Sequence, residues 1–235
     1  MRYAVFFTPM SDHPLTRSAA AWLGRDAFSG AVLERPDAVG LTPQEAADLT
    51  AAPRRYGFHA TLKAPFRLND DASETQLISA FQGLCEEAES FSLPRLTISR
   101  LGPFFALVPE EPSASLNRLA DQAVRALEPL RAPLTAAEIA RRNPDRLTPE
   151  QRRYLEEWGY PYVFDQFRFH MTLTGPVGDA DAGKAEKALH AWFDAVLAEP
   201  VEVSVLSLFV EPEPGDPFRV LTQVPIANSA IRKTA

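Results

Sequence analysis

The chain has 235 residues, of which 46% are hydrophobic, and it carries a formal net charge of -7. This length and composition are typical of one large globular domain or two small ones with a real hydrophobic core. The acidic balance provides no global basic field for a nucleic-acid backbone, so we expect a small substrate and not a long nucleic acid.

Features linked to localisation indicate a soluble protein. The opening residues MRYAVFFTPM contain an apolar run too short for a signal-peptide core, and no later stretch approaches the roughly 20 apolar residues of a membrane helix. The single cysteine, Cys85, falls on the apolar side of a predicted helix, which favours a buried structural thiol. We therefore expect a cytoplasmic protein with no membrane partner, and we expect it to be a monomer.

The first half of the chain predicts strands around two helices. Apolar runs predict strands at residues 3–8, 96–101 and 104–108. The spacing of apolar residues predicts a helix over residues 14–23 that Gly24 ends. A second helix is expected over residues 73–88, where Ser73 and Gln76 form a capping box.

The second half repeats this order. Apolar residues share one helical face over residues 116–130 and again over residues 181–197, and strand-like runs follow at residues 201–210 and 218–224. Residues 104–108 serve as the opening strand of this half, so the two halves interlock.

Two further helix starts and one insertion interrupt the symmetry. Thr42 and Thr148 are each followed by proline and then by Glu or Gln at the third helical position, a typical helix start. The second start lies within an Arg-rich insertion, residues 132–165, which ends in aromatic residues. Both a cover over a cleft and a solvated pair of helices fit this sequence.

An internal repeat organises the chain. Residues 58–66 (FHATLKAPF) and 169–177 (FHMTLTGPV) are identical at five of nine positions and begin 111 residues apart, close to half the chain length. This spacing indicates a duplication. We predict a single bilobal domain over residues 1–235, with one lobe at about residues 1–103 and the other at about residues 104–235, and with strands exchanged between the lobes.

Both copies of the repeat contain a His-x-Thr pair. Side chains alternate along a strand, so His59 and Thr61 share one face, as do His170 and Thr172, while the apolar residues between them face the helices. A lone His-x-Thr is usually a half-exposed polar pair. Two copies at equivalent places in a duplicated chain instead predict a shared functional site.

The residue types in this site suit phosphoester chemistry. Displacement at phosphorus needs one proton removed from the attacking oxygen and one given to the leaving oxygen, and two histidines with pKa values near neutrality can do both. The threonine hydroxyls can hold the non-bridging oxygens. Alternation also places Lys63 and Arg168 on these faces, where they would offset developing charge.

The other histidines do not share this context. His13 precedes a proline at a helix start, where capping or exposure is the default, and His190 lies within a helix beside a core leucine. One cysteine and dispersed histidines provide no close-spaced ligand set, so we expect no metal site.

With both motifs identified, the chain resembles the 2H phosphoesterase superfamily, which is named for two H-x-[ST] motifs on pseudo-symmetric lobes. Nearly the whole chain fits that plan. The segments RYAV at residues 2–5, WLGRD at residues 22–26 and YGFHATLK at residues 56–63 are similar to a bacterial branch of phosphonate-metabolism proteins.

This resemblance implies an α+β fold of two pseudo-symmetric lobes, each an antiparallel or mixed sheet backed by helices, around a central cleft. It assigns catalytic roles to His59, Thr61, His170 and Thr172 without metal or cofactor, and we add Tyr56 to the substrate-binding residues.

The function implied is a cyclic phosphodiesterase that acts on a small phosphorylated substrate, such as a ribose or nucleoside cyclic phosphate, in phosphonate metabolism. The alternatives are a 2′-5′ RNA ligase or phosphodiesterase and a non-catalytic protein that binds phosphorylated metabolites. A basic aromatic groove leading from the cleft would favour the RNA enzyme.

Overall fold

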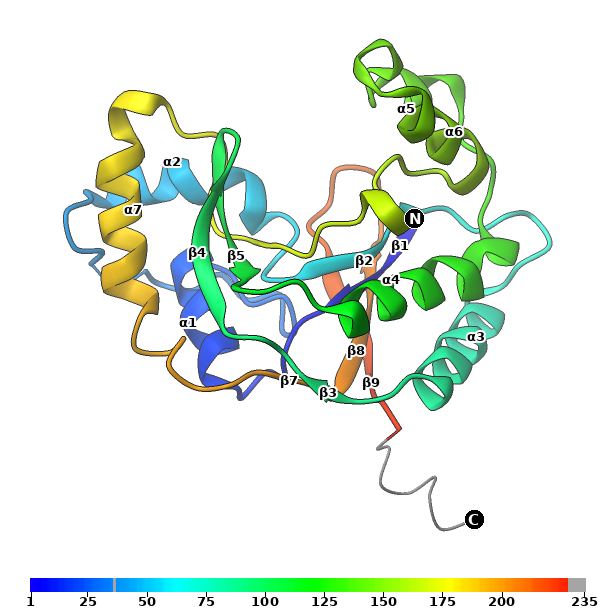
Figure 1. Ribbon diagram of the computed structural model, residues 1–235, viewed down its shortest axis with the longest axis horizontal. Coiled ribbons are helices and arrows are strands. Elements are labelled where there is room, and N and C mark those ends of the chain that lie inside the picture. Colours follow the sequence, from blue (N-terminus) through cyan, green and yellow to red (C-terminus); the bar gives the residue numbers. More distant parts are fainter. Residues whose placement is uncertain (36, 228–235) are drawn as a thin grey trace.

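A seven-stranded antiparallel sheet forms the centre of the computed structural model, which describes residues 1–35 and 37–227 (Figure 1). In spatial order its strands are β4 (Leu96–Leu101), β5 (Phe104–Pro109), β6 (Met171–Thr172), β2 (Ala60–Phe66), β1 (Arg2–Phe7), β8 (Val205–Glu211) and β9 (Arg219–Pro225). A separate two-stranded sheet pairs β3 (Phe91–Ser92) with β7 (Glu202–Val203). The predicted α+β class with antiparallel strands is confirmed.

The part of the chain that the structure describes contains seven α-helices. They are α1 (Pro14–Leu23), α2 (Pro43–Arg54), α3 (Glu74–Glu87), α4 (Ala114–Leu127), α5 (Ala136–Ala140), α6 (Pro149–Trp158) and α7 (Asp179–Phe193). Helices α1, α2 and α7 lie together on the side of β4 and β5, whereas α3 and α4 lie on the side of β8 and β9 (Figure 1). Each side therefore contains segments from both halves of the chain.

The local signals for helix ends are confirmed. Capping boxes begin α2 at Thr42, α3 at Ser73 and α6 at Thr148. In each, the hydroxyl oxygen of the capping residue accepts a hydrogen bond from a backbone N–H that has no partner within the helix. Helix α1 ends at Gly24, whose φ of 72° is a left-handed conformation that glycine adopts without steric cost.

The two faces of the sheet bury different sets of side chains. Val5 and Phe7 of β1 belong to the main core, which the helices cover. The alternate residues Ala4 and Phe6 belong to a smaller cluster on the opposite face, together with the buried ring of Phe218. This smaller apolar cluster therefore lies on the face of the sheet on which the alternation of side chains predicts the two motif histidines.

A β-bulge in β2 changes which face its residues occupy. Thr61 of β2 is opposite Phe6 of β1, and Lys63 is opposite the neighbouring residue, Val5. Leu62 therefore has no residue of β1 opposite it and forms the bulge. Lys63 consequently turns to the helix side with Val5. There its ammonium group donates to the carbonyl of Val124, at 3.0 Å, and is buried.

The buried charge of Lys63 is compensated at the end of α4. Its Nζ lies 2.8 Å from a carboxylate oxygen of Glu128, which also accepts from Arg131. Burial lowers the pKa of Lys63, and the charge of Glu128 opposes that shift. The pair therefore joins β2 to the C-terminal end of α4.

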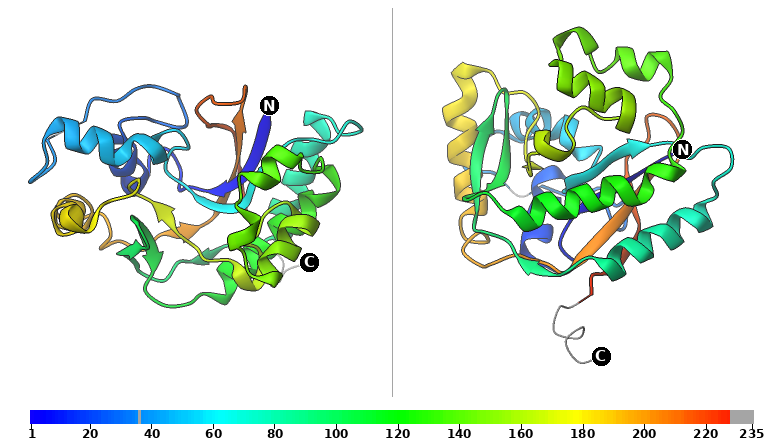
Figure 2. Two further views of the ribbon diagram at one scale, coloured as in Figure 1. Left: turned by 90° about the horizontal axis from the view of Figure 1, so that it is seen from above. Right: turned by 45° about the vertical axis from the view of Figure 1, so that its right-hand side comes forward.

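Helices α5 and α6 project from one end of the molecule, beyond the sheet (Figure 1 and the right-hand view of Figure 2). Short 3₁₀ turns at Glu128–Leu130 and Phe164–Gln166 lie where this insertion joins the rest of the fold, and a third, Pro144–Arg146, lies between α5 and α6. Within residues 1–35 and 37–227, none of the helices has the length and apolar character that crossing a bilayer requires.

Removing Glu128 should destabilise the protein more than removing Lys63. Glu128→Ala leaves the buried Lys63 charge beside Arg131 without a counter-charge, and we expect a loss of about 3 kcal/mol. Lys63→Met replaces the ammonium by an apolar end of similar length, and we expect a change within about 1 kcal/mol. Urea unfolding measures both. Equal losses for the two variants would contradict a role for the carboxylate in compensating a buried charge.

Candidate active site

The two histidine motifs meet where β2 pairs with β6, in the middle of the sheet. Ala60 is paired with Met171 in an antiparallel register. One step along this register places His59 across from Thr172 and Thr61 across from His170. Residues directly opposite on one face have Cβ atoms about 5 Å apart, so the structure brings the four predicted side chains together.

Both imidazoles are held by the same backbone contact. Nδ1 of His59 lies 2.9 Å from the carbonyl oxygen of Gly57, and Nδ1 of His170 lies 2.8 Å from the carbonyl oxygen of Arg168. A carbonyl can only accept, so Nδ1 carries the proton in each neutral ring. Nε2 is therefore the atom of each histidine that can take up or release a proton.

His59 lies in an aromatic environment that disfavours its charged form. Its ring stacks on Phe6 with 3.8 Å between the ring centroids, and the ring of Tyr56 lies 6.0 Å away. Burial lowers the pKa of His59 to about 4, against the opposing effect of the Gly57 carbonyl and with a smaller contribution from the charge of His170. The expectation of a pKa near neutrality is thus wrong for His59, because Phe6 removes water from one face of its ring.

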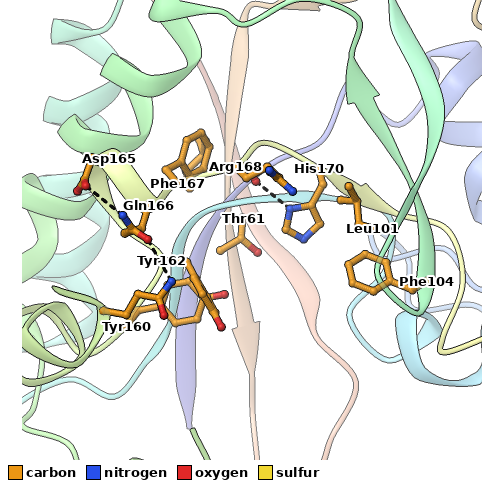
Figure 3. Close-up of a pocket in the computed structure, with 12 residues that line it drawn as sticks. Thr61, Leu101, Phe104, Tyr160, Tyr162, Asp165, Gln166, Phe167, Arg168 and His170 are labelled. Carbon is orange, nitrogen blue, oxygen red and sulfur yellow. Dashed lines mark hydrogen bonds between the residues drawn. The ribbon is translucent and has the colours of Figure 1, made fainter. Parts of the chain in front are cut away.

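A cavity of about 540 Å³ opens on the His170 side of the motifs, and we name it the His170 compartment. Figure 3 shows Thr61 and His170 near its centre, with Tyr160 and Tyr162 on one wall and Phe104 on the other. Arg168, predicted to bind substrate, also lines it.

A second cavity of about 350 Å³, the His59 compartment, lies on the other side of the motifs. His59 and Thr172 line it, and Thr61 and Tyr160 line both compartments, so the two form one divided cleft. Tyr56, another predicted substrate-binding residue, lines the His59 compartment, with its ring stacked on Phe218 at 5.2 Å.

The structure does not bring Lys63 to the cleft. Strict alternation along β2 predicts that Lys63 shares a face with Thr61, but the bulge at Leu62 turns it to α4, where Glu128 pairs with it. The prediction that Lys63 binds substrate is therefore wrong.

The insertion over residues 132–165 contributes to the cleft. Arg142 and Tyr160 line the His59 compartment, whereas Gln151 and Tyr162 line the His170 compartment. Of the two interpretations of this segment, the cover over a cleft is therefore the one that fits the structure. The aromatic run at its end was the signal in the sequence, but the sequence does not distinguish the residues that face the cleft from those that pack beside Val124.

The remaining predicted positions lie outside the cleft. His13 caps α1 by accepting from the amide of Leu15, and Nδ1 of His190 lies 2.9 Å from Asp194 on α7. Cys85 is buried, which raises the pKa of its thiol to about 12. Among residues 1–35 and 37–227, no three His, Cys, Asp or Glu side chains are grouped so that they could hold a metal ion.

Comparison with known proteins identifies the family. Residues 61–219 match the family described as "Protein of unknown function (DUF1045)", and the chain belongs to this family. It is 37% identical over 235 residues to a protein of Janthinobacterium sp. (strain Marseille) named "Ribose 1,5-bisphosphate phosphokinase PhnN", covering 98% of this chain and 52% of the relative. A protein of the same name from Laribacter hongkongensis (strain HLHK9) is 38% identical, covering 94% of this chain and 50% of the relative. The chain thus spans about half the length of these curated relatives.

Solved structures show a looser similarity. A structure described as a phosphoesterase is 14% identical and gives a TM-score of 0.45, covering 96% of this chain and 98% of the other. E. coli LigT complexed with 3′-AMP, also 14% identical with the same coverage, gives a TM-score of 0.44. Neither superposition assigns a role to a residue of this chain.

Substitution of Gly57 should disturb the orientation of His59. Gly57 has a φ of +77°, and an added Cβ would lie 2.5 Å from Cβ of Ala27, so Gly57→Ala must shift the backbone that carries the carbonyl acceptor. We expect a loss of about 1–3 kcal/mol in urea unfolding and a changed imidazole nitrogen shift of His59 by NMR.

Gly83 provides the control, because it lies within α3 with no atom within 4 Å of an added Cβ. Gly83→Ala should leave the His59 resonance unchanged and stabilise the protein by about 0.5 kcal/mol. An unchanged His59 signal in Gly57→Ala would show that the carbonyl does not orient the ring.

Proposed function

We propose that the protein is a metal-independent phosphoesterase that opens cyclic phosphodiesters of small phosphorylated metabolites. The observation that carries this proposal is the pair of His-Thr units across β2 and β6, in which each Nδ1 is occupied by a carbonyl and each Nε2 is left to exchange a proton. Two such imidazoles on one face supply the acid and the base that displacement at phosphorus needs.

The environments of the two imidazoles support different roles. His59 is uncharged at neutral pH because burial lowers its pKa, so its Nε2 lone pair is available as the general base. His170 then supplies the proton as the general acid. Like charges on nearby imidazoles oppose one another, which favours one charged and one neutral ring at the start of the reaction.

The reaction follows from these roles. Nε2 of His59 takes a proton from water as the water oxygen bonds to phosphorus. The bond between phosphorus and one sugar oxygen breaks, and that oxygen receives the proton from Nε2 of His170. The hydroxyls of Thr61 and Thr172 donate to the non-bridging oxygens, where charge builds up in the transition state. The product is a phosphate monoester.

Several features support a small ribose ester as substrate. The compartments of about 540 and 350 Å³ are of the size that suits small ligands. The curated relatives carry a name that refers to ribose 1,5-bisphosphate, which supports a ribose or nucleoside cyclic phosphate and a place in phosphonate metabolism. We further propose, on the sequence arguments above, that the protein acts as a cytoplasmic monomer.

One observation favours the 2′-5′ RNA alternative. Arg2 and Arg142 line the His59 compartment beside the ring of Tyr56, as a groove for an RNA strand would require. Arg2, however, is engaged by the buried carboxylate of Glu211, with one contact at 2.8 Å, and so contributes little net charge. This reading is therefore the second candidate.

The decisive test follows product formation by ³¹P NMR. The panel contains 2′,3′-cyclic nucleotides, ribose cyclic phosphates and a 2′-5′-linked dinucleotide, each with and without EDTA. We expect cyclic phosphates to become monoesters at an EDTA-independent rate. Turnover of the 2′-5′ dinucleotide alone would establish the RNA enzyme, and binding without turnover of any compound would establish a non-catalytic binder.

Substitution of the four motif residues should separate catalysis from folding. His59→Ala and His170→Ala should each reduce kcat by on the order of 100-fold or more, as expected for loss of general acid-base catalysis. Thr61→Ala and Thr172→Ala should cost about 10-fold, the effect of one hydrogen bond to a charged group. His190→Ala is the control, because His190 lies exposed on α7, and it should retain full activity. Retained turnover in both motif histidine variants would place the chemistry elsewhere.

The pH profile should reflect the low pKa of His59. The base form of His59 is populated above its pKa, so the acidic limb of the kcat/KM profile of the free enzyme should lie near pH 4. Protonation of a histidine whose pKa is lowered by folding also favours the unfolded chain. Stability contributed by neutral His59 is therefore complete above about pH 6.5 and decreases toward pH 4. An acidic limb near pH 6.5 would contradict the lowered pKa of His59.

A further inference from the structure

The His59 compartment is a cationic cavity on an acidic protein. Arg2 and Arg142 line it, and no carboxylate occurs among the described residues that form its walls. The His170 compartment differs, since its lining includes the carboxylate of Asp165 as well as Arg168. The two ends of the cleft therefore favour different parts of a substrate, and an anionic group fits the His59 end.

Arg142 is the cation of this cavity that is free to bind a ligand. Both guanidinium contacts of Arg2 go to Glu211, whose side chain is fully buried. Nearby on the insertion, Arg152 and Arg153 pair with carboxylates. The guanidinium of Arg142 has no carboxylate partner within residues 1–35 and 37–227, and instead lies over the ring of Tyr160, 4.9 Å from its centroid.

The position of this guanidinium over the ring of Tyr160 restrains it. A guanidinium that lies over an aromatic face keeps its N–H groups directed outward at its edge, where they can form the paired hydrogen bonds that suit a phosphate. Tyr160 lines both compartments, so it places Arg142 next to the catalytic motifs and not at a remote surface.

Three of the aromatic rings that line this cavity already pack against another ring or a guanidinium, which argues against a nucleobase as the occupant; they are Phe6, Tyr56 and Tyr160. Arg142 covers Tyr160, and Tyr162 packs against the same ring at 5.5 Å. Tyr56 is stacked on Phe218 with an interplanar angle of 14°. An anionic group that meets Arg142 edge-on is accommodated more easily than a flat base.

We propose that Arg142 recognises a second phosphate on the substrate, distinct from the phosphate that lies between His59 and His170. The inference rests on the proposed function and narrows its substrate class to sugar cyclic phosphates that also carry a phosphomonoester. Arg142 acts as a specificity-determining residue, because it contacts a part of the substrate that does not react.

The test compares two stable product analogues, adenosine 2′-phosphate and adenosine 2′,5′-bisphosphate, by isothermal titration calorimetry. The wild-type protein should bind the bisphosphate at least about 10-fold more tightly, the effect of one charge-assisted contact. Arg142→Gln should reduce this ratio to about one, and Arg142→Lys should restore part of it, because a lysine keeps the charge without the planar pair of donors.

Arg141→Gln is the matched control. Arg141 precedes Arg142 on the same insertion and is exposed, and its Nε donates to the carbonyl of Ala137. The Arg141→Gln substitution therefore removes one positive charge without changing a residue that lines the cleft. This variant should keep the preference for the bisphosphate. Loss of preference in both variants would indicate a general charge effect and would overturn the proposal, as would equal binding of both analogues by the wild-type protein.

The two analogues contain no cyclic ester, so the binding ratio does not depend on turnover. A preference that depends on Arg142, with no opening of any cyclic phosphate, would reject the proposed reaction and retain the phosphate site. Turnover of cyclic phosphates with no preference for a second phosphate would reject the site and retain the reaction.

Discussion

The pairing of Ala60 with Met171 is the constraint on which the rest of the site depends. It is the junction between the strands backed by α7 and those backed by α3 and α4, and it joins the third and fourth strands of the sheet counted from β4. An antiparallel pair has a local two-fold axis, so identical motifs on its strands present equivalent groups on one face. The pairing of these two strands is thus enough to place the two repeated motifs symmetrically, and no other helix or strand is needed to align them.

The surroundings of the motifs break this symmetry. Both imidazoles contact a carbonyl two residues earlier in the chain, but only His59 stacks on a buried phenylalanine of β1, whereas His170 lies 5.9 Å from the ring of Phe104 at the mouth of the cleft. The two rings therefore have different environments, and the acid and base roles proposed above require such a difference. The backbone contacts of His59 and His170 are alike, whereas the aromatic side chains around the two rings differ.

Local chemistry explains which features the sequence predicts well. Capping residues such as Ser73 act within one helical turn, and the repeated motif fixes its own face of a strand, so both can be read from short segments. Lys63 could not be placed, because the bulge that turns it depends on the register with β1, a strand about sixty residues away. Arg142 was missed for a similar reason: its contact with Tyr160 arises from the path of the insertion, which no periodic pattern records.

The central position of β1 affects how the chain can fold during synthesis. This strand is made before every other strand of the sheet, yet it lies between β2 and β8, and Ala4, Val5 and Phe6 are fully buried in the finished sheet. Its pairing with β8 joins residues more than 200 positions apart, as in the contact of Tyr3 with Val210. Until β8 leaves the ribosome, one edge of an apolar strand has no partner, and contacts of such long sequence separation form slowly. The nascent chain therefore carries an unpaired, aggregation-prone strand edge from the synthesis of β1 until β8 has been made.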